Sequence, residues 1–244
     1  MFRLFKLCLT LVLCCLFFEN ASAQKVTTTP AGRIDAYTDF IHPIGNDEDG
    51  YVILNFNNKE IIVQGINIKD FSKRTEEYKL KIDRKEKSYN FINVVKLNNK
   101  FYIIYYHTQS KTSTKILARE INLKNATVND RAIELIELDD VASYRERFWG
   151  FNITYNFGVN TEFDLIQDED KTHFSLIYST KLNNNSNKQV GGKAADTYKP
   201  NINVLTFDDK LQLVYNNSSE FPYALRDVSI YAFTLDNNDN LYYL

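Results

Sequence analysis

Two apolar runs separated by a pair of asparagines, within Phe91–His107 (FINVVKLNNKFYIIYYH), constrain the fold more than any other stretch of the chain. Asparagine tolerates positive φ, so Asn98-Asn99 between runs rich in β-forming residues predicts a tight hairpin. The second run, Phe101–Tyr106, has no polar position, whereas a strand with one solvated face alternates apolar and polar residues. We therefore expect this strand to be covered on both faces, as happens when sheets stack on one another.

Further apolar runs joined by short polar turns continue this plan along the chain. The expected strands are Tyr37–Ile41, Tyr51–Phe56, Glu60–Ile68, Glu76–Ile82, Thr114–Leu123, Arg131–Leu138, Glu162–Ile166, His173–Tyr178, Ile202–Phe207, Leu211–Tyr215, Ser229–Leu235 and Leu241–Leu244. The chain holds 27 asparagines but only 8 glycines and 4 prolines. We therefore expect asparagine and aspartate to form most of the turns that glycine forms in other proteins.

The spacing of the strands repeats in a degenerate way. Ile66–Asp70 (INIKD) resembles Ile121–Asn125 (INLKN) at an offset of 55 residues, while Val52–Val63 also aligns with the region from Val94, through a shared Asn-Asn-Lys, at an offset of 41. A unit of about 40–55 residues with four strands is typical of a propeller blade. The predicted fold class is therefore all-β, a β-propeller-like series of antiparallel four-stranded blades, with a β-sandwich as the alternative.

The N-terminal segment Met1–Ala23 has the three parts of a secretory signal peptide. Arg3 and Lys6 give it a positive start, an apolar segment follows, and Ala21-Ser22-Ala23 is a small-x-small cleavage site. The apolar segment is too short to span a membrane, and the cysteines lack the preceding small residue of a lipoprotein cleavage site. We expect cleavage after Ala23 and export to the periplasm, the cell surface or the extracellular space, with no transmembrane segment in the mature chain.

Cysteine usage has a direct consequence for stability. All 3 cysteines lie within residues 1–23, so the mature chain has none for a disulfide, for thiol catalysis or for a metal site. Its stability must come from packing, for which the chain holds 17 phenylalanines and 16 tyrosines. We interpret residues 24–33 as a linker and residues 34–244 as the β-propeller-like domain.

Two segments near the C-terminus carry a family resemblance. They are Glu162–Tyr178 (EFDLIQDEDKTHFSLIY), with Phe163, Asp168 and Lys171, and Glu220–Leu244 (EFPYALRDVSIYAFTLDNNDNLYYL), with Phe221-Pro222-Tyr223, Asp236, Asn240 and Tyr242. Both resemble blade segments of secreted β-propeller proteins of Bacteroidetes, many of them uncharacterised, over about the last hundred residues and more loosely before them. The resemblance implies a fold, not a chemistry. Because the fourth expected unit has two strands, the chain resembles either the opening part of a longer propeller, incomplete at its C-terminus, or a truncated product.

Candidate catalytic residues are few. His42, His107 and His173 lack the spacing of metal ligands, and we expect them to be structural. Asp139-Asp140 and Asp168–Asp170 are paired acids of the kind a glycosidase needs, although acids gather in β-turns in any case. No nucleophile motif appears, and Gly191-Gly192-Lys193 lacks the flanking strand and helix of a phosphate loop. The sequence predicts no catalytic residue, no metal and no cofactor.

The segment Tyr144–Tyr155 (YRERFWGFNITY) contains the only tryptophan of the chain. Aromatic and arginine side chains are what recognition surfaces concentrate, including those that stack on sugars. The candidate ligand-binding residues are Arg145, Arg147, Trp149 and Tyr155. The alternative is that Trp149 and Phe151 fill a gap between two blades while the arginine–glutamate pairs are solvated.

The charge pattern indicates no particular partner. The formal net charge is −2 and no basic stripe is present, so nucleic-acid binding is not expected. The function that we predict is an exported binding or scaffolding module at the bacterial envelope, with an envelope protein or a carbohydrate as its unknown ligand. The alternative is a propeller-type enzyme that acts on carbohydrate in its central channel, for which acids or histidines must converge in one pocket.

Overall fold

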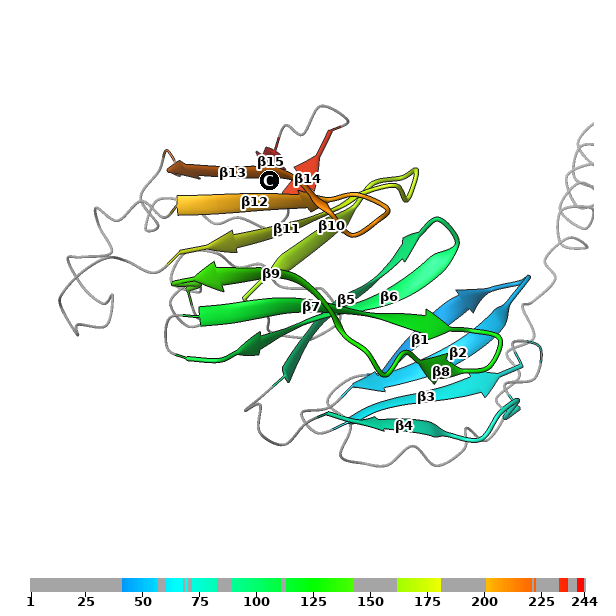
Figure 1. Cartoon of the computed structure of the whole chain (residues 1–244). Coiled ribbons are helices and arrows are strands. Elements are labelled where there is room, and N and C mark those ends of the chain that lie inside the picture. The colour runs from blue at the N-terminus through cyan, green and yellow to red at the C-terminus, as the bar shows by residue number, and fades with distance from the viewer. Residues whose placement is uncertain are drawn as a thin grey trace, which may run out of the picture. The chain divides into compact units, whose positions relative to one another are not determined.

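The structure is a computed structural model that describes residues 41–56, 60–67, 69, 72–82, 89–110, 113–142, 162–180, 201–220, 222, 233–236 and 241–243. All of them belong to the larger of the chain's two compact units, Arg33–Leu244. Every named element in this part of the chain is a strand, and all strand pairs are antiparallel (Figure 1). The predicted all-β class is therefore confirmed.

The first sheet is a four-stranded meander in chain order. Its strands are β1 (Ile41–Asn46), β2 (Gly50–Phe56), β3 (Glu60–Ile66) and β4 (Tyr78–Lys81). The predicted C-terminal boundary of the first strand, Ile41, is wrong, because β1 continues to Asn46 and pairs with β2 throughout. Pro43 is compatible with this assignment because β1 lies at an edge of the sheet, where a missing N–H needs no partner.

The second sheet repeats the meander with an interrupted fourth strand. Its strands are β5 (Tyr89–Leu97), β6 (Lys100–Thr108), β7 (Ser113–Asn122), β8 (Thr127–Val128) and β9 (Ile133–Asp139). Both β8 and β9 pair with β7, β8 at its C-terminal end and β9 along the rest. The sequence predicted β9 but not β8, because a two-residue strand carries no periodicity.

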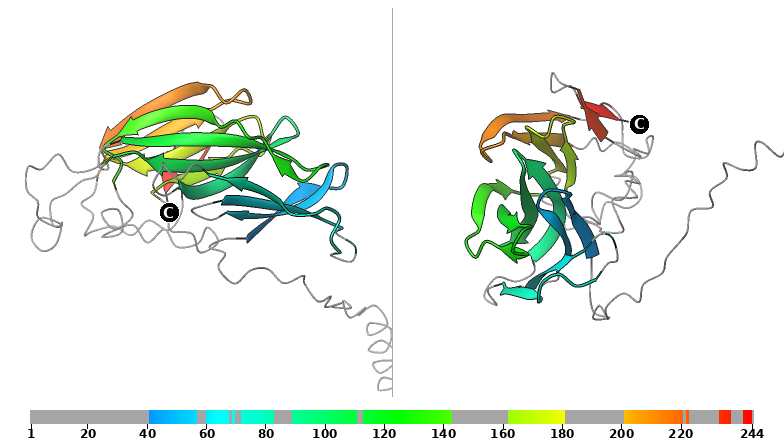
Figure 2. Two further views of the ribbon diagram at one scale, coloured as in Figure 1. Left: turned by 60° about the horizontal axis from the view of Figure 1, so that its bottom comes forward. Right: turned by 90° about the vertical axis from the view of Figure 1, so that its right-hand side faces the viewer.

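The third sheet is again a four-stranded meander, and a two-stranded sheet follows it. The strands are β10 (Asp164–Gln167), β11 (Phe174–Ser179), β12 (Asn201–Phe207) and β13 (Leu213–Glu220), then β14 (Phe233–Leu235) and β15 (Leu241–Tyr243). Figure 2 shows the sheets from two further directions. The antiparallel four-stranded blades of the prediction are thus present, and the series does not close into a ring.

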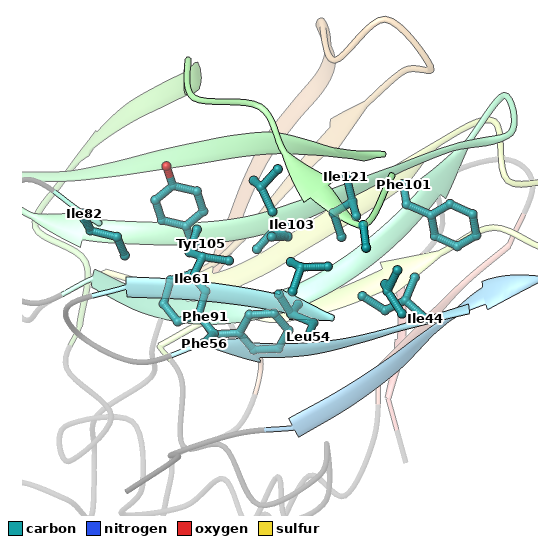
Figure 3. Close-up of a cluster of buried hydrophobic side chains, with 14 of the residues drawn as sticks. Ile44, Leu54, Phe56, Ile61, Ile82, Phe91, Phe101, Ile103, Tyr105 and Ile121 are labelled. Atoms are coloured by element: carbon teal, nitrogen blue, oxygen red, sulfur yellow. The ribbon is translucent and has the colours of Figure 1, made fainter. Parts of the chain in front are cut away.

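Strand β6 is buried on both faces, as the sequence predicted. Its residues from Phe101 to His107 are all buried. The first core cluster joins the first two sheets (Figure 3) and includes Ile44, Val52, Leu54, Phe56, Ile61, Phe91, Phe101, Ile103 and Tyr105. The second core cluster joins the second and third sheets and includes Val95, Tyr102, Ile104, Tyr106, Phe174, Leu176, Leu205 and Phe207. Because the middle sheet is covered on both faces, the described sheets do not form the two layers of a β-sandwich.

The turns use asparagine and aspartate in two ways. Asn98 and Asn99, between β5 and β6, have φ of 44° and 63°, which makes the predicted tight hairpin. Three other turn residues with positive φ, Ala126, Lys171 and Leu211, are neither asparagine nor aspartate. In each of these turns an earlier side chain accepts a backbone N–H instead; the acceptors are Asn122, Asp168 and Asp208. The prediction about turns is therefore confirmed in part.

The two offsets of the internal repeat are now distinguishable. Ile66 ends β3 and Ile121 lies at the end of β7, and both are third strands of their sheets. The offset of 55 therefore matches equivalent strands. The offset of 41 matches β2 with β5, a second strand with a first one, so that alignment is out of phase.

The described residues include no helix long and apolar enough to span a lipid bilayer.

Candidate functional site

The antiparallel meanders give the sheets two different ends. At one end, which we name the turn end, lie the connections between first and second strands and between third and fourth strands. These are the described turns at residues 46–50, 98–99, 123–126, 168–173 and 208–212. At the other end, which we name the connection end, lie the turns between second and third strands, and the segments that lead from one sheet to the next begin there.

The predicted ligand-binding residues Arg145, Arg147, Trp149 and Tyr155 lie outside the described residues. The chain leaves the described part at Ala142, just before this segment. The backbone N–H of Ala142 donates a hydrogen bond of 2.8 Å to the carbonyl oxygen of Ser179. Val141 forms an antiparallel bridge with Thr180. The segment therefore starts at the connection end, from a point held between the second and third sheets.

The same bridge is the starting point of a second segment. The chain also leaves the described part at Thr180, just before the Asn-rich stretch Lys181–Lys199. Val141, Ala142 and Ser179 are 5–7% exposed, so the bridge lies in the protein interior. The segments 143–161 and 181–200 thus both begin next to one buried, hydrogen-bonded position.

Aromatic rings gather in the interior at the connection end. Phe163, just before β10, lies 5.1 Å from Tyr106 and 5.6 Å from Tyr178 between ring centroids. Burial raises the pKa of the Tyr178 hydroxyl above its ordinary value of 10.0. At the same end Tyr89 lies 5.1 Å from the ring of His107. These rings are buried beneath this end, and none of them is exposed enough to be a binding surface by itself.

His107 and His173 do not meet in the described part of the chain. His107 is buried near the end of β6, and its Nδ1 has no hydrogen-bond partner. His173 lies at the turn end, where its Nδ1 is 2.9 Å from the hydroxyl of Thr172 and 3.6 Å from a carboxylate oxygen of Asp168. His42 pairs through its backbone with Leu54 in the first sheet. His107 lies at the connection end of β6 and His173 lies at the turn end. Because the length of the strand separates these ends, the two histidines cannot act on one substrate atom.

The two acid pairs also lie at opposite ends. Asp140, with φ of 52°, precedes Val141 at the connection end, whereas Asp168 accepts hydrogen bonds at the turn end. The length of β11 separates them, which is about 20 Å at ~3.3 Å per residue. A glycosidase needs its two carboxyl groups at ~5–10 Å, so these two pairs do not form one catalytic couple.

Asp168 has a structural role in its turn. Its carboxylate accepts the hydroxyl of Thr172 at 2.7 Å and the backbone N–H groups of Thr172 and His173 at 2.9 and 3.0 Å. Partial burial acts to raise the pKa of Asp168, but these hydrogen bonds and the nearby His173 together outweigh it and lower the pKa below 3.8. This carboxylate is therefore an ionised turn former. Among the described residues, no group of three or more His, Cys, Asp or Glu side chains is placed to hold a metal ion.

Sequence reasoning missed one surface, strand β13. The prediction ended this strand at Tyr215, and this boundary is wrong, because β13 runs from Leu213 to Glu220. The residues Asn216–Ser219 are poor β-formers, and their pairing with β12 outweighs their propensity. The alternation of exposed and buried positions that reveals most strands is absent here because β13 is exposed on both faces.

No protein family model matches this sequence, and no curated protein matches it. Among solved structures, the chain is similar to an α-L-arabinofuranosidase from Clostridium thermocellum, with 11% sequence identity and a TM-score of 0.37. The likeness covers 75% of this chain and 54% of the arabinofuranosidase, so this chain spans about half the length of that protein. A similarity of this size assigns neither a family nor an activity.

Proposed function

We propose that this protein is an exported binding module whose ligand is held at the connection end, by Arg145, Arg147, Trp149 and Tyr155. The observation that carries this proposal is the buried bridge between Val141–Ala142 and Ser179–Thr180, from which the segment starts. A loop that starts from a fixed and buried position on stacked sheets is a common place for recognition residues. The aromatic rings beneath this end supply the rigid support that such a surface needs.

The chemistry of the four side chains points to a polar ligand with apolar faces. The indole of Trp149 and the phenol of Tyr155 stack on the C–H faces of sugar rings or on aromatic groups. The guanidinium groups of Arg145 and Arg147 donate hydrogen bonds to carboxylates and hydroxyls in a fixed planar geometry. A carbohydrate, or an envelope protein that carries one, combines both kinds of group.

Tryptophan fluorescence tests this proposal directly, because the chain contains 1 tryptophan. The emission of Trp149 therefore reports on this segment alone. We expect its intensity or wavelength to change on titration with at least one of a panel of soluble polysaccharides, and the same polysaccharide to retard the protein in affinity electrophoresis. Retardation should be lost in Trp149→Ala and weakened in Arg145→Ala. Arg131→Ala, which removes an exposed arginine from the opposite end of β9, is the matched control.

The alternative function, a carbohydrate-active enzyme, gives a different result in the same assay. Release of reducing ends from a polysaccharide by the wild-type chain would support it. Binding without release supports the module. If no polysaccharide changes the emission spectrum or the electrophoretic mobility, a carbohydrate ligand is excluded. An envelope protein is then the remaining candidate ligand.

Export is tested separately. The N-terminus of the protein recovered outside the cytoplasm should be Gln24, which follows the proposed cleavage site at Ala23. Mass spectrometry of the intact chain measures this, and a product that retains Met1 contradicts it.

A further inference from the structure

Strand β13 is the most exposed regular element of the described chain. Seven of its eight residues are exposed, and the eighth, Tyr215, is half-buried. Two of its large apolar side chains face solvent, with 39% of Leu213 and 54% of Val214 exposed. It is one of the two edge strands of the third sheet, and among the described strands it pairs with β12 alone. Among the described strands, none pairs with its second backbone edge. Figure 1 shows β13 at the far side of the third sheet from β10.

The last strands of the other two sheets, β4 and β9, carry exposed charges along their length, whereas β13 carries one only at its end, Glu220. Strand β4 carries Lys79 and Lys81, both exposed. Strand β9 carries Glu134, Glu137 and Asp139, also exposed, of which the two glutamates face Lys115. Charged side chains are the usual means by which a protein stops its edge strands from pairing with other chains. The stretch Leu213–Ser219 contains no charged residue.

We propose that β13 pairs with β13 of a second copy of this chain, antiparallel and about a two-fold axis at Asn216. This register places Val214 opposite Ser218 and Leu213 opposite Ser219 of the second copy. Glu220 falls opposite Gln212, so no two like charges meet across the seam. Backbone hydrogen bonds of the two open edges join the third sheets of both copies into one continuous sheet.

The charge pattern favours a second copy over an unrelated strand. An uncharged edge offers nothing that selects a charged peptide, whereas its own sequence, run in the opposite direction, is neutral at every position paired within Leu213–Ser219 and places Glu220 opposite an uncharged glutamine. Pairing also removes Leu213 and Val214 from solvent in both copies at once. A two-fold contact of this kind closes at two chains and does not propagate into a fibre. The contact is small, so we expect a dissociation constant of about 1–100 μM.

Analytical ultracentrifugation of the exported chain tests the pairing. The wild-type chain should sediment as a mixture of monomer and dimer whose dimer fraction rises with concentration. Asn216→Lys places two ammonium groups face to face at the axis, and Asn216→Asp places two carboxylates there, so each variant should be monomeric. An equimolar mixture of the two variants should recover the dimer, because opposite charges then meet. Asn125→Lys, which adds a charge to an exposed turn residue, should dimerise like the wild type.

Hydrogen exchange places the contact on β13. The amides of this strand should exchange more slowly at high protein concentration than at low concentration, while those of β4 and β9 remain unchanged. Monomeric wild-type chain at about 200 μM overturns the proposal, since this lies above the expected dissociation constant. A dimer that persists in both Asn216 variants overturns it as well. Protection of β13 that appears only after an envelope extract is added points to a different partner and also overturns it.

Discussion

The guanidinium of Arg74 donates a hydrogen bond of 2.6 Å to the carbonyl oxygen of Leu123, across the boundary between the first and second sheets. Its other terminal nitrogen donates to the carbonyl oxygen of Lys124 at 2.7 Å. The planar fork of arginine matches these two adjacent carbonyls. Gly50 and Gly65 make room for it, because a Cβ at either position would come within 3.3 or 3.1 Å of the guanidinium. The turn ends of two sheets are thus joined by one side chain.

Loss of the Arg74 guanidinium should destabilise the protein. Arg74→Ala leaves the carbonyl of Leu123, a buried residue, without this donor, and we expect a loss of about 2 kcal/mol in the free energy of unfolding. Arg74→Lys keeps the charge but cannot serve both carbonyls in the same geometry, so it should lose about 1 kcal/mol. Urea denaturation measures both. Lys124→Ala, which removes an exposed side chain and keeps the accepting carbonyl, should leave the midpoint unchanged.

Because β6 is buried on both faces, we expect substitutions at two adjacent positions of this strand to be equally destabilising. Ile103 and Ile104 are adjacent, each is 0% exposed, and they belong to different core clusters. We expect Ile103→Ala and Ile104→Ala to cost about 3–4 kcal/mol each in free energy of unfolding, because each leaves a cavity. In a strand with one solvated face, only one of two neighbours would be costly. Ile133→Ala, at an exposed position of β9, is the control and should change stability by less than about 0.5 kcal/mol.

The positive φ of Lys171 predicts a stabilising substitution. Lys171 has φ of 57° and an exposed side chain, so it carries the steric cost of the left-handed region without compensating burial. Lys171→Gly should raise the free energy of unfolding by about 1 kcal/mol. Lys210→Gly in the corresponding turn of the next hairpin should lower it, because Lys210 itself, unlike its neighbour Leu211, has no positive φ, and glycine only adds entropy to the unfolded chain. Equal effects of the two substitutions would contradict this explanation.

Asp168 predicts a pH dependence of stability on the acid side. Its pKa is lower in the folded protein than its ordinary value of 3.8, so the folded state binds fewer protons than the unfolded state in that range. The stabilising contribution is complete above 3.8 and disappears as the pH falls through the lower, folded pKa. Asp168→Asn keeps an oxygen acceptor for the backbone N–H groups but cannot titrate. Thermal melting between pH 2 and pH 5 should show a shallower acid-side loss in this variant, and parallel curves would refute the role given to the carboxylate.

The sequence anticipated the parts of this fold that short-range patterns encode. The run Phe101–Tyr106 without a polar position predicted two covered faces, and Asn98-Asn99 predicted the hairpin beside it, and both are present. Strand β8 and the C-terminal half of β13 carried no such pattern. They exist because neighbouring strands β7 and β12 offer them hydrogen-bond partners, which is information that a local sequence does not contain.

The same distinction applies to the candidate functional residues: the sequence reveals their types, and the structure reveals their positions. His107, His173 and the two acid pairs were recognised by residue type, yet only the order and direction of the strands showed that they lie at opposite ends of the sheets. Arg145, Arg147, Trp149 and Tyr155 stay a prediction from composition, now with a defined starting point at Ala142.

The amino-acid sequence by itself determined that this chain is a series of antiparallel β-hairpins, because side-chain alternation and asparagine turns act over a few residues. Only the tertiary structure decided which strands are exposed. It also decided which carbonyl oxygens accept hydrogen bonds from Arg74 and which backbone N–H donates to the carbonyl oxygen of Ser179. Those contacts join residues tens of positions apart, and their geometry depends on how whole sheets stack.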